Sequence, residues 1–235
     1  MKILIRLFIF LGATSGMYAQ NERLEVDTTI VDNKYREDQF YAAVTYNLLA
    51  KKPSEVSQSG FSSGFHGGYI RDMPINPRRN LAIGLGIGLS TNSYNQTLQI
   101  IETSPGEYNY SIINDRDISF SKNKFSTYIL EFPVQFRWRT STATSYDFWR
   151  IYTGFKIGYV FYTSSKFVGQ PSDTKLSNIE DFNKVQYGFT MSAGYDTINV
   201  YVYYSLKDLF SSDAQIDGSP IEMNPIKIGL IFYIL

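Results

Sequence analysis

Few side chains in this sequence have the chemistry of a catalytic or metal site. His66 is the only histidine, and cysteine is absent, which excludes disulfides, a cysteine nucleophile and thiolate metal ligands. A histidine-dependent hydrolase would have to use His66, which lies in a glycine-rich stretch without an evident partner in the sequence. We therefore expect a protein that is not an enzyme, with no catalytic residue, no metal and no cofactor.

Two acidic pairs and one glycine-rich stretch are the other candidates. Glu102 and Glu107, and Asp115 and Asp117, could hold calcium, but they lack the glycine-centred spacing of a calcium loop. A solvated loop is the simpler interpretation. Residues 84–90, GLGIGLS, alternate like a strand and are not followed by a helix, so they do not predict a phosphate-binding loop.

Alternation of large apolar residues with small or polar ones predicts eight strands. The clearest is LAIGLGIGLS from Leu81, in which leucine and isoleucine alternate with alanine, glycine and serine. The eight segments begin near Phe40, Gly60, Leu81, Leu130, Trp149, Val185, Ile198 and Ile226.

The connections between these segments alternate in length. Those at residues 73–80, 140–147 and 196–197 are short, whereas those at about 96–123, 164–184 and 207–224 are long and polar. This alternation is typical of outer-membrane barrels with short periplasmic turns and longer outer loops. The predicted fold is therefore all-β, an eight-stranded antiparallel up-and-down transmembrane β-barrel of the outer-membrane type, with both termini periplasmic.

The first residues have the features of a secretory signal. Lys2 and Arg6 precede the apolar run LFIFLGA, and Ala19 is a small residue ahead of the expected cut. We expect a signal peptide at residues 1–19, a polar periplasmic extension at 20–38 and the outer-membrane barrel domain at 39–235. Lysine and arginine together balance aspartate and glutamate, 22 against 22, so charge does not indicate a nucleic-acid partner. Outer-membrane lipids are the expected surroundings.

The composition of the two strand faces indicates which one meets lipid. In a soluble barrel the apolar face would point inward. Here the opposite face is rich in glycine, alanine and serine, which suits the narrow interior of an eight-stranded barrel. Trp138 and Trp149 flank one short connection on the apolar face, where a periplasmic aromatic girdle belongs. We therefore expect the apolar face to be outside, with a soluble barrel or sandwich as the alternative.

The polar side chains of the opposite face would then lie in the lumen. They are His66, Glu131, Gln135, Arg137, Arg150, Tyr152 and Lys156, with Arg139 near the mouth. Because unpaired buried charges are costly, we favour a network of satisfied polar groups over a proton or substrate relay. Pro133 lacks an N–H for the ladder and predicts a bulge or a local break.

The connection RDMPINPRRN, residues 71–80, is basic and contains two prolines. It is either a capped turn whose arginines touch lipid phosphates or a docking surface for a periplasmic partner, and both interpretations stay open. The candidate docking residues are Arg71, Asp72, Pro74, Asn76, Arg78 and Arg79.

The last strand carries a polar residue, a glycine, an aromatic residue and an apolar residue at a characteristic spacing. These residues are Lys227, Gly229, Phe232 and Ile234. The pattern resembles the terminal signal read by the barrel assembly machinery, an expected partner, although Leu235 replaces the common terminal aromatic residue.

Five collinear stretches carry a more specific signal. They are VTYNLL (44–49), VSQSGFSSGFHGGYIRDMPINPRRN (56–80), IGLGIGLSTNSYNQ (83–96), FRWRTSTATSYDFWRIYTG (136–154) and LKDLF (206–210). Together they resemble the PorT family, outer-membrane barrels of the Bacteroidetes type IX secretion system that are also tied to gliding motility. The resemblance implies a role in assembling or supporting the translocon for cargo with a C-terminal signal, other components of that system as partners, and no catalytic residues. The alternatives are a structural or small-solute barrel of the OmpA/OmpX kind and an outer-membrane lipid-modifying enzyme.

Overall fold

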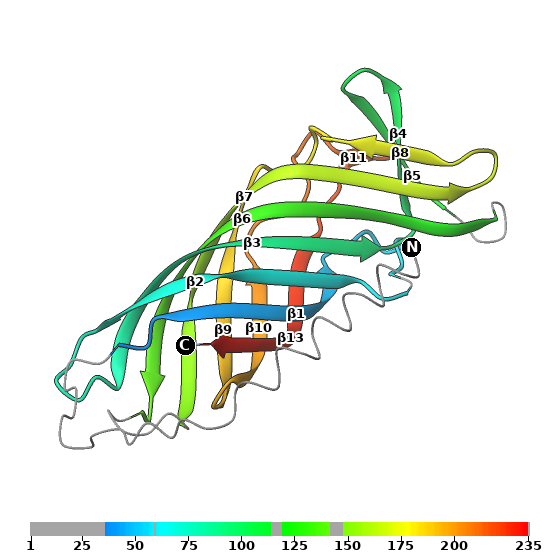
Figure 1. Ribbon diagram of the computed structural model, residues 1–235. Helices are drawn as coiled ribbons and strands as arrows, with labels where there is room; N and C mark the ends of the chain where they lie inside the picture. Colours follow the sequence, from blue (N-terminus) through cyan, green and yellow to red (C-terminus); the bar gives the residue numbers. More distant parts are fainter. Residues whose placement is uncertain (1–35, 59, 114–118, 142–147, 235) are drawn as a thin grey trace, which may run out of the picture. The chain divides into compact units, whose positions relative to one another are not determined.

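Eight long strands form a closed antiparallel barrel in the computed structural model (Figure 1). The structure describes residues 36–58, 60–113, 119–141 and 148–234. Around the barrel the order is β6-β3-β2-β1-β13-β10-β9-β7, and pairing between β6 and β7 closes the ring. These strands are β1 (Gln39–Ala50), β2 (Ser63–Pro74), β3 (Leu81–Asn95), β6 (Phe120–Arg139), β7 (Trp149–Gly169), β9 (Val185–Tyr195), β10 (Ile198–Ser205) and β13 (Asn224–Ile234).

Each of these strands corresponds to one of the eight segments predicted from alternation, so the predicted up-and-down barrel is confirmed. The predicted signal peptide, and the predicted extension as far as residue 35, lie outside the described residues. No described segment is a helix long and apolar enough to cross a bilayer.

The two ends of the barrel differ. We call the end that carries the β2–β3, β6–β7 and β9–β10 connections, the start of β1 and the end of β13 the turn end. The opposite end is the loop end. Arg79 and Asp196 have positive φ angles of 55° and 51° in two of the turn-end connections, a conformation that tight turns require.

The loop-end connections contain secondary structure of their own. Strands β6 and β7 run for 20 and 21 residues, and the short strand β8 (Thr174–Ser177) pairs with the end of β7. Strands β4 (Leu98–Ser104) and β5 (Glu107–Ile112) form a hairpin, and β11 (Gln215–Ile216) pairs with β12 (Ser219–Pro220). Figure 1 shows β8 (yellow) lying alongside β7 (yellow-green). The predicted long connections are therefore confirmed, but they contain short strands that were not predicted from the sequence.

Apolar side chains from these connections and from the adjoining parts of the barrel strands pack together in one cluster, which we call the loop-end cap. Its buried members are Leu49, Val56, Tyr94, Leu98, Ile100, Tyr110, Phe125, Ile179, Phe182, Leu209, Phe210, Ala214, Ile221 and Met223. The Phe125 ring is 5.2 Å from that of Tyr94, 5.4 Å from Phe182 and 5.6 Å from Phe210, measured between centroids. Because all four loop-end connections contribute, the cap joins segments that are far apart in the sequence.

The barrel strands bury their polar face and expose their apolar face. In β6, Glu131, Gln135 and Arg137 are buried, whereas Phe132 is 41% and Trp138 37% exposed. Large exposed apolar residues occur on every barrel strand; one from each is Phe40, Phe65, Leu85, Phe132, Ile157, Phe189, Val200 and Leu230. This inside-out pattern is that of a barrel whose wall meets lipid.

Glycines on the inner face of β3 leave room for long side chains from other strands. A Cβ atom added to Gly84 would lie 2.9 Å from Nε of Arg137, and one added to Gly88 would lie 2.1 Å from the hydroxyl oxygen of Tyr41. The GLGIG alternation therefore provides the space in which the lumen side chains are packed.

Pro133 interrupts one ladder without a bulge. Between β3 and β6, Leu85 pairs with Val134 and Gly88 with Glu131, but the residues between these pairs are not paired. The bulges of β6 lie elsewhere, on its β7 side, between Phe120 and Lys122 and between Tyr128 and Ile129. Pro133 thus produces the local break that the sequence predicts.

Candidate functional site: a filled lumen and a basic turn end

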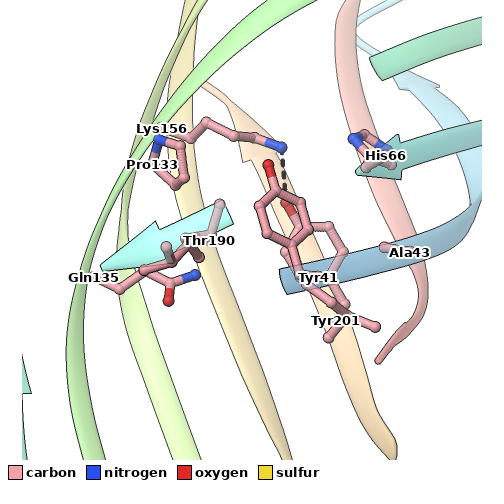
Figure 2. A pocket seen from close by; sticks show the side chains of 10 residues that line it. Tyr41, Ala43, His66, Pro133, Gln135, Lys156, Thr190 and Tyr201 are labelled. Atoms are coloured by element: carbon pink, nitrogen blue, oxygen red, sulfur yellow. Dashed lines mark hydrogen bonds between the residues drawn. The ribbon is translucent and has the colours of Figure 1, made fainter. Parts of the chain in front are cut away.

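The central part of the lumen is organised around Glu131 of β6. Its Oε1 accepts a hydrogen bond from Oγ of Ser90 at 2.8 Å and lies 3.1 Å from Nδ1 of His66. Its Oε2 accepts from Nζ of Lys156 at 2.9 Å, and the same ammonium donates to the hydroxyl of Tyr201 at 3.0 Å. Figure 2 shows Lys156 and His66 reaching toward Tyr201 from different strands. We call this set the Glu131 cluster.

One arrangement within this cluster has the order of a hydrolase triad. Nε2 of His66 lies 3.4 Å from Oγ1 of Thr45, and its Nδ1 faces Glu131. However, Thr45 is 1% exposed, and its hydroxyl donates to Oδ1 of Asn47 at 2.8 Å. The adjoining cavity, lined by His66 and Lys156 among others, has a volume of about 10 Å³, enough for about one water molecule. The described lumen beside this triad offers no space for a lipid or peptide substrate.

A second cluster lies toward the turn end, around Asp72 of β2. Nη1 of Arg137 donates to Oδ1 of Asp72 at 2.9 Å. Arg139 donates through Nη1 and Nη2 to both carboxylate oxygens at 2.8 Å. All three side chains are fully buried. Two arginines on one carboxylate, in charge-assisted bonds of this length, link β2 to β6 across the intervening β3.

The Asp72 cluster also holds the chain where it begins β1. Arg137 donates to the carbonyl oxygen of Glu37 at 3.1 Å and to Oε1 of Gln39 at 2.9 Å. Burial raises the pKa of the Glu37 carboxyl, and the Arg139 guanidinium opposes this shift. The segment that precedes the barrel is therefore tied into the lumen at its turn end.

The predicted lumen residues are all buried, but they do not form one network. Glu131 is bound by His66 and Lys156, whereas Arg137 is bound by Asp72 and by Oε1 of Gln135 at 3.2 Å.

Arg137 and Arg150 also contact aromatic rings. The Arg137 guanidinium lies 4.4 Å from the ring centre of Tyr152. Arg150 stacks over Phe148 at 4.4 Å, and its Nε and Nη1 make no hydrogen bond.

One sequence assignment needs correction. Asp72, proposed as part of a docking surface, is 0% exposed and cannot contact a partner, because its carboxylate neutralises two arginines inside the barrel. Arg139 is the last residue of β6 and lies near the mouth as expected, but its side chain is 1% exposed and belongs to the same cluster. The alternation of β2 could have predicted the burial of Asp72. This residue lies two positions after the inward-facing Ile70 and therefore on the same face of the strand.

The other candidate docking residues lie on or near the turn-end surface. Arg71 and Arg78 are exposed, and Pro74, Asn76 and Arg79 are partly buried. Asn76 caps the connection, since its Nδ2 donates to Oδ1 of Asn80 at 2.6 Å and its Oδ1 accepts from N of Leu81 at 3.1 Å.

This turn is also joined to the interior, because the carbonyl oxygen of Arg79 accepts from Nε of Arg139 at 3.1 Å. The connection is therefore a rigid element that presents Arg71 and Arg78 outward.

The two predicted girdle tryptophans lie on the outer surface, whereas residues of the predicted assembly signal in β13 lie on both faces of the strand. Trp138 and Trp149 are 37% and 60% exposed at the turn end of β6 and β7, and the Trp149 ring lies 5.4 Å from that of Tyr195. In β13, Ile234 is exposed, whereas Lys227 is 1% exposed and lies in the lumen with Nζ 5.0 Å from the ring centre of Tyr203. Sequence reasoning missed Lys227 as a lumen residue.

The chain matches one family model and has weak similarity to several solved structures. No curated protein matches the chain. Among solved structures, Ail, the attachment invasion locus protein of Yersinia pestis, is 12% identical over 84% of this chain and 98% of that one, with a TM-score of 0.34. Ail in complex with the heparin analogue sucrose octasulfate is 14% identical over 84% and 99%, with a TM-score of 0.34. A mutant of the Rh. blastica porin is 7% identical over 85% and 100%, with a TM-score of 0.21.

A family model gives the assignment. Residues 18–211 match the outer membrane protein beta-barrel domain, which is most of the chain and includes seven of the eight barrel strands. The protein therefore belongs to the outer membrane protein beta-barrel domain family and is an outer-membrane β-barrel protein.

Proposed function

We propose that the chain is a non-enzymatic outer-membrane component of the type IX protein secretion system. It supports assembly or operation of the translocon that exports cargo with a C-terminal signal. The observation that carries this proposal is the collinear resemblance to the PorT family. Its two longest stretches, residues 56–80 and 136–154, each include a turn-end connection of the barrel.

The turn end is the proposed periplasmic side and the proposed docking side. The uneven distribution of arginine and lysine along the barrel supports this orientation. Within the described ranges, the arginines are Arg36, Arg71, Arg78, Arg79, Arg137, Arg139 and Arg150, and all belong to strand ends or connections at the turn end. Apart from Lys156 and Lys227 in the lumen, the described lysines lie toward the loop end. A partner with acidic side chains would complement the exposed Arg71 and Arg78.

The filled lumen favours an accessory role over the alternative of a small-solute barrel. Two polar clusters and the loop-end cap occupy the interior, and the two cavities that Lys156 lines measure about 10 Å³ each. Since one such volume holds about one water molecule, neither cavity is a path for a solute. The protein would then act through its surfaces.

Deletion of the gene tests the proposed role. We expect signal-bearing cargo to be lost from the medium and restored by the wild-type gene. Intact secretion together with altered envelope permeability would instead support the structural or small-solute barrel and refute the proposal.

A second experiment tests the docking surface. We expect Arg71→Gln with Arg78→Gln to reduce co-purification of partner proteins from mildly solubilised outer membranes, because both side chains point outward and their loss leaves the barrel intact. The matched control is Lys122→Gln with Lys175→Gln, two exposed residues toward the loop end. Full recovery of partners by the arginine variant would reject the docking surface.

The alternative that the protein is a lipid-modifying enzyme can be tested at His66, the one candidate for its catalytic base. We expect His66→Ala to leave the outer-membrane lipid profile unchanged, because the histidine is buried beside Glu131 without a substrate cavity. A change in a specific lipid, with normal barrel abundance, would contradict the non-enzymatic role.

A further inference from the structure

We propose that the lumen binds one small monovalent anion, such as chloride, between Lys156 of β7 and Lys227 of β13. The site is a cavity of about 10 Å³ among buried side chains, and its lining includes both lysines, Glu131, Gln186 and Tyr203. A volume of this size accommodates a single water molecule or an ion of similar dimensions. This proposal is independent of the secretion role.

Charge balance around the cavity is the first argument. Lys156 and Lys227 are 6% and 1% exposed, and each ammonium lies 5.0 Å from the centre of the same Tyr203 ring. Glu131 pairs with Lys156 at 2.9 Å, but Lys227 has no described carboxylate within ion-pair distance. With both lysines protonated, the cavity holds two ammonium groups and one carboxylate, and a buried charge without a counter-charge is strongly disfavoured.

Hydrogen-bonding capacity is the second argument. Gln186 is 2% exposed, and its Nε2 is a buried donor without a partner. Both oxygens of Glu131 already accept bonds, from Ser90 and from Lys156. The cavity thus offers spare donors from Lys227 and Gln186. Water would have to donate as well as accept, whereas a halide only accepts, so these donors favour the anion.

Bromide can be located directly, because it scatters anomalously and resembles chloride in size and charge. We expect crystals of the full mature chain soaked in sodium bromide to show an anomalous peak among Lys156, Lys227 and Gln186. Absence of a peak at this place, with the cavity empty or occupied by water, would overturn the proposal.

A carboxylate placed in the cavity should replace the ion. Gln186→Glu preserves the shape of the side chain and gives Lys227 a counter-charge. We expect the wild-type protein in detergent to lose thermal stability when chloride is exchanged for gluconate at constant ionic strength, because a ligand of the folded state raises Tm. In Gln186→Glu we expect this chloride dependence and the bromide peak to disappear.

Lys184→Met is the matched control, since Lys184 is exposed toward the loop end. It should retain the full chloride dependence of the wild-type Tm. Equal chloride dependence in the wild type and Gln186→Glu would contradict the site. If Gln186→Glu does not fold, the bromide experiment on the wild type decides alone.

Discussion

Asp72 illustrates how much depends on single lumen residues. Its carboxylate receives three bonds of 2.8–2.9 Å from Arg137 and Arg139 in a fully buried environment. Arg137 in turn holds the start of β1 through Gln39, and Arg139 holds the β2–β3 connection through Arg79. Loss of one carboxylate would leave two buried arginines unpaired.

We therefore expect Asp72→Asn to lower the free energy of unfolding by about 3–5 kcal/mol, the usual cost of removing one partner from a buried ion pair. Urea unfolding of the protein reconstituted in lipid vesicles measures it. Asp196→Asn makes the same chemical change in a tight turn at the same end and should shift the midpoint little. Equal midpoints for the two variants would contradict the role assigned to Asp72.

For single residues, the sequence predicts which side chains face the lumen better than it predicts which residues they bind. Alternation along β6 places Glu131, Gln135 and Arg137 in the lumen, where the structure has them. It does not reveal that Arg137 pairs with Asp72, because that contact spans 65 residues and depends on the stagger of strands around the barrel. Arg150, which stacks on an aromatic ring instead of forming an ion pair, was unpredictable for the same reason.

Strand β3 shows how an element makes room for its neighbours. Three consecutive inner positions are Gly84, Gly86 and Gly88, and side chains from β1, β2 and β6 fill the space that the missing Cβ atoms leave. A glycine-rich strand is intrinsically poor at forming sheet. Its composition is therefore explained by packing inside the barrel.

Gly88→Ala should destabilise the barrel by about 1–3 kcal/mol, the usual effect of overpacking. The new methyl group would meet the Tyr41 hydroxyl at 2.1 Å and the backbone oxygen of Gly67 at 2.7 Å. Gly67→Ala is the control, because its nearest neighbour would be at 3.7 Å. Thermal unfolding in detergent compares them, and a Gly88→Ala variant as stable as Gly67→Ala would refute the packing argument.

The loop-end cap is a second element whose stability can be measured. Phe125 is fully buried in it and contacts the rings of Tyr94, Phe182 and Phe210. We expect Phe125→Ala to lower the free energy of unfolding by about 3–5 kcal/mol through cavity formation. Phe161→Ala, at a site 51% exposed on the outer wall of the barrel, should have a smaller effect in the same urea titration. The reverse order would show that the cap is not a packed core.

Strands with long alternation could be predicted, whereas the cap could not. Each loop-end connection contributes only a few apolar residues, separated by polar ones, and none of these segments forms a long periodic pattern. Leu98, Phe182 and Phe210 meet only because β3, β6, β7, β9 and β10 bring their connections to one end. Such contacts are a property of the assembled barrel.

The whole molecule is a membrane barrel that is closed by its own side chains. The Asp72 cluster lies toward the turn end, the Glu131 cluster lies in the middle, and the loop-end cap lies at the opposite end. The exposed apolar wall meets lipid, and the basic turn end is the proposed docking surface. In this account the lumen is a core that supports these surfaces.

Electrical recording tests this account most directly, because a filled lumen cannot carry ions. Purified wild-type protein, with insertion verified by protease protection, should give no stable unitary conductance above that of the bare planar bilayer. Discrete and reproducible conductance steps from the wild-type protein would contradict the filled lumen and favour a solute channel.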